Sequence, residues 1–237
     1  MTTILITGAS SGIGRATAEL FLSEGWTVGL VARRAERLRE IAAGQAGAIP
    51  LPADVSDAEA MRAVFDQFIG EVGHLDVLFN NAGIFGPVAS PDEVSVEDFD
   101  QVMAVNLRGM FIAARLAFEQ MRAQDPQGGR IINNGSISAH VPRENSICYT
   151  TSKHAVTGMT RSLSLDGRAF DIACGQIDIG NAESELVADL KARQPGMQTM
   201  DVAYAAGSVL HMAQLPLSAN VQFMTVMATK MPYIGRG

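Results

Sequence analysis

A tyrosine and a lysine stand four residues apart, at Tyr149 and Lys153. The apolar residues from Ala155 to Leu163 predict a helix here, and a spacing of four places both side chains on one helix face. Because a free tyrosine has a pKa of about 10, ready proton exchange at neutral pH requires the phenolate to be favoured by about three units, roughly 4 kcal/mol. A neighbouring ammonium supplies part of this. The pair predicts general acid–base chemistry, with a solvated helix face as the alternative that spacing alone leaves open.

A serine precedes this pair. Ser136 lies thirteen residues before Tyr149 and just beyond a β-rich run, Arg130 to Asn133. A hydroxyl at the carboxyl end of a strand is placed to contact a substrate oxygen. Ser138 is a competing candidate, and a serine in this position is also a common turn residue.

A glycine-rich turn follows the first β-rich run. It reads Thr7-Gly8-Ala9-Ser10-Ser11-Gly12-Ile13-Gly14. Gly8 permits a sharp turn, Gly12 lets the backbone approach a phosphate, and Gly14 allows the next helix to pack closely on the strand. Unpaired N–H groups at the helix start would face the anion. The turn predicts a dinucleotide phosphate site, and a plain tight turn between strand and helix is the alternative.

The end of the second β-rich run carries two arginines, Arg33 and Arg34, and no carboxylate. A site for NAD usually has an Asp or Glu here that accepts hydrogen bonds from the adenosine ribose. Two guanidinium groups favour a 2'-phosphate instead. We therefore expect NADP(H), with NAD(H) as the second choice. The alternative is that both arginines only solvate the start of the following helix.

These residues need a scaffold of alternating strands and helices. The runs that read as strands are Ile4–Thr7, Thr27–Ala32, Asp76–Asn80, Arg130–Asn133, Ile172–Asp178 and Val221–Val226. Segments of helical period separate them; one apolar stripe extends from Met61 to Val72 and has a plausible helix start at Asp57. Strict alternation implies right-handed crossovers and a parallel, doubly wound α/β sheet with helices on both faces. Ligands bind such sheets at the carboxyl ends of the strands.

Composition excludes several classes of protein. The 237 residues are 47% hydrophobic and 18% charged, enough to bury a core and unlike a disordered or fibrous chain. A net charge of -7 argues against broad electrostatic binding of nucleic acid or anionic membrane. Cys148 and Cys174 have neither metal-type nor disulfide-framework spacing, so we expect no metal and a reducing, cytoplasmic setting. No apolar run is long enough for a membrane span, and from the first residues we expect a protein that is not exported.

The set of motifs resembles the short-chain dehydrogenase/reductase family over nearly the whole chain. The glycine-rich turn is similar to the family's cofactor turn, and the Tyr149–Lys153 pair to its catalytic pair. Further similarities are Asp54 before Val55 for the adenine contact, Asn80-Asn81-Ala82-Gly83 for the fourth-strand motif, Asn106 for the catalytic asparagine and Ser136 for the catalytic serine. The resemblance implies one Rossmann-like NAD(P)-binding domain over residues 1–237, with about seven strands.

One segment departs from the family pattern. Where the family commonly has Pro-Gly and a threonine four residues after the glycine, this chain reads Ile179-Gly180-Asn181-Ala182-Glu183-Ser184. Ser184 keeps the hydroxyl, whereas loss of the proline changes the stiffness of the loop.

By the resemblance, the chain is an oxidoreductase that interconverts a carbonyl and a secondary alcohol on a small molecule, chiefly by NADPH-dependent reduction. Tyr149 would act as general acid, Ser136 would hydrogen-bond the substrate oxygen, and Lys153 would favour the phenolate and hold the nicotinamide ribose. Asn106 would keep a water that links Lys153 to solvent. The expected cofactor-binding residues are Gly8, Ser10, Ser11, Gly12, Ile13, Gly14, Arg33, Arg34, Asp54, Val55, Asn81, Ala82, Gly83, Tyr149, Lys153, Gly180 and Ser184. The alternative is a non-catalytic NADP(H)-binding regulatory or structural subunit on the same fold.

The sequence also suggests a partner and residues that lie near the substrate. The segment from Phe99 to Met121 and the helix near Tyr149 resemble the paired helices through which family members dimerise, so we expect a homodimer or homotetramer. The chain end, Met231 to Gly237, could add a second interface. The residues expected to border the pocket, or simply to be solvated, are His140, Arg143, Glu144 and Asn145. Those expected to form an apolar lid, or to belong to the core, are Leu186, Val187, Leu190, Met197 and Met200.

Overall fold

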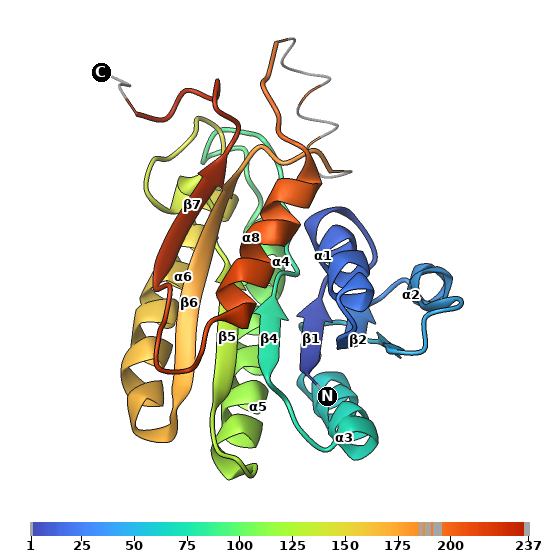
Figure 1. Ribbon diagram of the computed structural model, residues 1–237. Helices are drawn as coiled ribbons and strands as arrows, with labels where there is room; N and C mark the ends of the chain where they lie inside the picture. Colours follow the sequence, from blue (N-terminus) through green and yellow to red (C-terminus); the bar gives the residue numbers. More distant parts are fainter. Residues whose placement is uncertain (1, 185–186, 188–190, 192–195, 235–237) are drawn as a thin grey trace.

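Seven parallel strands form one sheet in the order β3-β2-β1-β4-β5-β6-β7 (Figure 1). The computed structural model describes residues 2–184, 187, 191 and 196–234. The strands are β1 (Thr3–Thr7), β2 (Thr27–Ala32), β3 (Ala48–Pro52), β4 (Val77–Asn80), β5 (Gly129–Asn134), β6 (Ile172–Gly180) and β7 (Phe223–Met227). The strand order reverses between β1 and β4, which is the switch point where doubly wound sheets bind ligands.

Helices cover both faces of this sheet, so the predicted doubly wound α/β architecture is confirmed. The helices are α1 (Gly12–Ser23), α2 (Ala35–Ala42), α3 (Ala58–Val72), α4 (Val96–Met103), the π-helix η1 (Ala104–Gly109), α5 (Met110–Ala123), the short η2 (Ile137–Ala139), α6 (Ile147–Asp166), the short η3 (Gly167–Phe170) and α8 (Val202–Gln214). One core layer contains side chains of α1, α2 and α8, and the other contains side chains of α3 and α5. In Figure 1, α1 and α8 lie in front of the sheet and α5 lies behind it.

Strand β3 is the element that the hydrophobic pattern misses. Pro50 and Pro52 interrupt its apolar run, and a proline within a run argues against a central strand. The strand nevertheless pairs in parallel with β2, with Leu30 opposite Pro50. It lies at the edge of the sheet, where a missing N–H breaks no ladder on the open side.

Helix α3 follows the predicted apolar stripe. The Asp57 carboxylate accepts hydrogen bonds from the backbone N–H groups of Glu59 and Ala60, each at 3.0 Å, which caps the helix start. Met61 and Phe68 on the stripe are fully buried against the sheet. The predicted helix start and its buried face are both confirmed.

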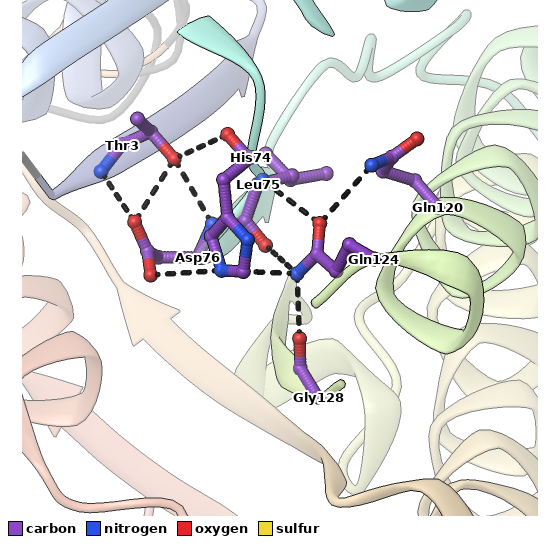
Figure 2. A network of polar contacts seen from close by, with 7 residues as sticks. All are labelled: Thr3, His74, Leu75, Asp76, Gln120, Gln124 and Gly128. Carbon is purple, nitrogen blue, oxygen red and sulfur yellow. Dashed lines mark hydrogen bonds and ion pairs between the residues drawn. The ribbon is translucent and has the colours of Figure 1, made fainter. Parts of the chain in front are cut away.

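A polar network ties together the amino-end side of the sheet (Figure 2). The Thr3 backbone N–H at the start of β1 donates to Asp76 Oδ2 at 2.7 Å, and the Asp76 N–H donates back to Thr3 Oγ1 at 3.0 Å. The Gln124 side chain, just after α5, accepts from the Leu75 N–H at 3.0 Å and donates to the Leu75 and Gly128 carbonyl oxygens at 2.9 and 2.8 Å. These contacts fix β1 beside β4, the two strands whose carboxyl ends flank the switch point.

The helices and the acidic, histidine and cysteine side chains were also compared with what a membrane span and a metal site require. None of the helices in the described residues is long and apolar enough to cross a membrane. The described residues also contain no cluster of His, Cys, Asp and Glu suited to holding a metal ion.

Candidate active site

A cavity of about 710 Å³ opens at the carboxyl ends of the strands. That volume lies in the range of about 300–1,000 Å³ typical of small-molecule sites. The structure brings nearly all of the predicted site residues to its wall: Gly8, Ser10, Ser11, Gly12, Ile13, Arg33, Arg34, Asp54, Val55, Asn81, Ala82, Gly83, Ser136, Tyr149, Lys153, Gly180 and Ser184. The two that lie behind the wall are Gly14 and Asn106.

The glycine-rich turn has the backbone that its sequence requires. Gly8 and Gly12 have φ angles of 70° and 53°, the left-handed region that only glycine adopts freely. A Cβ on Gly14 would lie 2.3 Å from the Gly8 carbonyl oxygen, so this glycine permits the close packing of α1 on the turn. The Thr7 hydroxyl accepts from the N–H groups of Asn81 and Ala82 at 2.9 and 3.0 Å, which joins the turn to the segment after β4.

The two arginines after β2 lie at one end of the cavity. Arg34 Nη2 donates to Ser10 Oγ at 3.0 Å and to Ser11 Oγ at 2.7 Å, so its guanidinium is held against the glycine-rich turn. The Arg33 side chain is 70% exposed, and its Nη1 lies 3.9 Å from Asp54 Oδ2. Hydrogen bonds from Ser56 hold the pKa of Asp54 below its ordinary value, so that carboxyl is ionised at neutral pH.

Tyr149 and Lys153 project from α6 toward the end of β5, with Lys153 Nζ 5.4 Å from the tyrosine ring centroid. Burial raises the pKa of Tyr149 above its ordinary value of 10.0, while a hydrogen bond with the Ser136 side chain and the charge of Arg143 lower it. The expectation that the pKa of Tyr149 is lowered toward neutrality is therefore wrong for this structure, because burial outweighs the groups that favour the phenolate. The hydroxyl stays protonated at neutral pH, which is the form that donates a proton during reduction.

Lys153 is only 3% exposed. Its Nζ donates to the Asn134 carbonyl oxygen at 2.7 Å. Burial lowers the pKa of this lysine from 10.5 to about 8, although the charge of Asp178 raises it in part. A charged ammonium next to the tyrosine is thus retained at neutral pH, and it is lost as the pH rises through about 8.

The contacts of the two candidate serines differ. The Ser136 side chain lies close enough to Tyr149 to lower the pKa of its hydroxyl, and Ser136 Oγ accepts from the Ser138 N–H at 3.1 Å. Ser138 Oγ is buried and has no hydrogen-bond partner among the described residues. Since both residues line the cavity, the geometry associates Ser136 with the tyrosine and leaves the Ser138 hydroxyl unpaired.

Asp178, near the end of β6, is a functional candidate that the sequence pattern does not reveal. Its side chain is 1% exposed; Oδ1 accepts from the Ser136 N–H at 2.8 Å and from Gln176 Nε2 at 2.7 Å. Oδ2 lies 2.8 Å from His140 Nε2. A Cβ at Gly135 would meet Asp178 Oδ1 at 2.1 Å, so a glycine before the serine lets the carboxylate hold the Ser136 backbone.

Asn106 lies in the π-helix η1 and is fully buried. Its Oδ1 accepts from the Ile84 N–H and its Nδ2 donates to the Ile84 carbonyl oxygen, both at 2.8 Å. Nδ2 also donates to Ser152 Oγ at 3.1 Å. The side chain therefore anchors the segment after β4 to α6, behind the cavity wall.

The segment without the family proline continues the sheet. Isoleucine at 179 keeps the residue in β6, where Ile179 pairs with Val226 and Gly180 with Met227. The Ser184 Cβ lies 3.0 Å from the position a Cβ would take on Gly12, so this segment lies over the glycine-rich turn. Among the predicted lid residues, Val187 lines the cavity and Met200 packs on the core. Leu186 and Leu190, like residues 235–237, lie outside the described residues.

The sequence of this chain is similar to those of known dehydrogenases. A family model described as short chain dehydrogenase matches residues 2–195. A 3beta-hydroxysteroid dehydrogenase of Mediterraneibacter gnavus is 35% identical over 198 residues, which are 80% of this chain and 71% of that protein.

Two solved structures have the same fold. A short chain dehydrogenase from Burkholderia cenocepacia in complex with NADP is 29% identical, with a TM-score of 0.83 over 95% of this chain and 96% of that one. A 3-ketoacyl-(acyl-carrier-protein) reductase from Brucella melitensis complexed with NADH is 24% identical, with a TM-score of 0.87 over 95% and 96% of the two chains.

Proposed function

Because the chain belongs to the short-chain dehydrogenase/reductase family and is an NAD(P)-dependent oxidoreductase, we propose that it interconverts a carbonyl and a secondary alcohol on a small substrate, chiefly as an NADPH-dependent reductase. The observation that carries this proposal is the grouping of Ser136, Tyr149 and Lys153 on one wall of the cavity that the glycine-rich turn also lines. We propose further that residues 1–237 act as one domain.

In this proposal, the Tyr149 hydroxyl gives its proton to the carbonyl oxygen during reduction, and the phenolate takes a proton from the alcohol in the reverse direction. The Ser136 hydroxyl donates a hydrogen bond to the same oxygen as charge develops on it. Lys153 stabilises the phenolate electrostatically, and Asp178 positions the Ser136 backbone. Asn106 holds the Ile84 segment and α6 together. We propose that it also keeps a water molecule that links Lys153 to solvent.

The cavity suits a nicotinamide dinucleotide, which supplies or accepts the hydride when bound. The glycine-rich turn presents the start of α1 to a pyrophosphate. Gly83 and Ala82 would contact the ribose side, Lys153 the nicotinamide ribose, and Ser184 the carboxamide.

We propose NADP(H) as the preferred form. Arg34 is held beside Ser10 and Ser11, so two hydroxyls and a guanidinium face the same corner of the cavity. Arg33 is mostly exposed and shares only a long contact with Asp54, which leaves its donors available to a 2'-phosphate. Charge-assisted bidentate contacts of this kind favour a phosphate over a hydroxyl.

A second copy of the chain is the proposed partner. An apolar hollow on the outer side of α4, η1, α5 and α6 is lined by Met103, Leu107, Phe111 and Met159, and Phe111 is 54% exposed. This surface coincides with the segment that resembles the family's dimerisation helices, which supports a homodimer or homotetramer. Both cysteines are free thiols, which supports a reducing, cytoplasmic setting.

A steady-state assay with NADPH and a panel of aldehydes and ketones tests the proposal. We expect turnover of at least one carbonyl compound and slower turnover with NADH. Tight NADPH binding with no turnover of any carbonyl or alcohol would favour the alternative, a non-catalytic NADP(H)-binding subunit.

A further inference from the structure

The loop between η2 and α6 places one cationic side chain, that of Arg143, in the wall of the cavity near Tyr149. Arg143 lines the cavity, and its guanidinium carbon lies 5.7 Å from the Tyr149 ring centroid and 5.6 Å from the Phe85 ring centroid. The two rings meet edge to face with centroids 4.7 Å apart. Two aromatic rings therefore fix the position of the guanidinium.

The guanidinium has no anionic partner in the described part of the chain. Its Nε is buried without a hydrogen bond, and no described carboxylate forms an ion pair with it. By contrast, the other cavity arginines have protein contacts, Arg33 with Asp54 and Arg34 with two serines. A buried donor of a charged group with no partner is costly, so a ligand that pairs with it binds with that cost relieved.

Other residues of the cavity indicate which anionic group would pair with Arg143. Apolar residues, Ile84 and Ile137 among them, line the same cavity as Arg143. Ser138 lines the same cavity and contributes a buried hydroxyl that has no hydrogen-bond partner among the described residues. A fixed guanidinium and an unpaired hydroxyl that line one cavity match a carboxylate, which accepts bidentate hydrogen bonds from arginine.

The position of Arg143 also limits the separation between the anionic group of the ligand and its reacting oxygen. The guanidinium lies over the same ring whose hydroxyl exchanges the proton. The anionic group and the reacting carbonyl must therefore be only a few covalent bonds apart. From this geometry we infer that the substrate is a small oxo acid or hydroxy acid, whose carboxylate pairs with Arg143 while its carbonyl or alcohol oxygen faces Tyr149 and Ser136. This inference rests on the proposed carbonyl–alcohol function.

A binding experiment tests the site without requiring turnover. The probes are butyrate and its neutral isostere butyramide, titrated by calorimetry into the enzyme saturated with NADP⁺. We expect butyrate to bind about ten- to a hundredfold more tightly than butyramide, since a charge-assisted contact is worth that range. In Arg143→Met the two ligands should bind alike, and Arg143→Lys should restore part of the preference.

The matched control is Arg122→Met. Arg122 also stacks on an aromatic ring, with its guanidinium carbon 4.3 Å from the Phe170 centroid, but it does not line the cavity. This variant should keep the full preference for butyrate. Equal binding of the two probes by the wild type, or an unchanged preference in Arg143→Met, would overturn the inference.

A turnover series separates this inference from the proposed function. It compares pyruvate, acetoacetate and 4-oxopentanoate with the corresponding amides. A higher kcat/KM for at least one acid, with the acid-to-amide ratio reduced at least tenfold in Arg143→Met, supports the inference. Reduction of the amides with no preference for the acids overturns the inference and leaves the proposed function standing. Arg143-dependent butyrate binding with no reduction of any compound supports the anion site and overturns the proposed function.

Discussion

Replacing Lys153 by methionine should separate the stability of the protein from its activity. Burial lowers the pKa of Lys153 from 10.5 to about 8, and this difference of about 2.5 units corresponds to a destabilisation of about 3 kcal/mol at neutral pH. Methionine removes that cost, but it leaves the Asn134 carbonyl oxygen without its 2.7 Å donor, which costs roughly 1–3 kcal/mol. The free energy of unfolding at pH 7 should therefore stay close to that of the wild type, whereas cofactor affinity and turnover both fall.

The pH dependence gives the sharper measurement. Below pH 8 the lysine is protonated in the native and unfolded states, so the full cost is present. Above about 8 the native state loses the proton first, while the unfolded chain keeps it until about 10.5, so the wild type gains stability as the pH rises. Urea denaturation should show a gain of roughly 2 kcal/mol between pH 7 and 9.5 that Lys153→Met lacks. Lys230→Met, at an exposed lysine, should follow the wild type. Identical pH profiles for wild type and Lys153→Met would refute this reasoning.

Three other predictions concern the cofactor, the oxyanion contact and the assembly. Arg33→Asp should weaken NADPH binding by about one to two decades in a fluorescence titration, from the loss of a charge-assisted contact; equal binding of NADPH and NADH by the wild type would contradict the assignment. Ser136→Ala should lower kcat by about a hundred- to a thousandfold, and by more than Ser138→Ala; the reverse order would assign the oxygen contact to Ser138. Light scattering should give the wild type a mass well above 25.2 kDa and give Phe111→Glu a smaller one; a wild-type mass near 25.2 kDa would exclude the oligomer.

The parts of the site that sequence predicts are those in which a residue type is forced by geometry. Gly8 and Gly12 need left-handed φ angles, and Gly14 has no room for a Cβ, so the turn leaves a recognisable pattern. The spacing of Tyr149 and Lys153 follows from the helical repeat. Such constraints act within one short segment, so the sequence of that segment is enough to predict them.

The parts that sequence misses depend on contacts between distant segments. Asp178 reads, with Gln176, as one of two polar residues within an otherwise apolar strand, and only folding brings it to the Ser136 backbone, 42 positions away in the chain. Likewise, the loop before α6 offers several charged residues, and only the packing of Arg143 on Phe85 and Tyr149 selects the one that faces the cavity. Strand β3 was missed because Pro50 opposes strand propensity, which pairing with β2 overrides.

The replacement of Tyr149 by phenylalanine tests the central claim most directly, because it removes only the ionisable hydroxyl and keeps the ring that packs on Phe85. The measurement is single-turnover reduction of a carbonyl substrate by purified Tyr149→Phe, alongside a titration of NADPH and a thermal melt. We predict an unchanged fold, cofactor affinity close to that of the wild type, and nearly complete loss of turnover. A variant that retains about a tenth or more of the wild-type rate would contradict proton transfer by Tyr149.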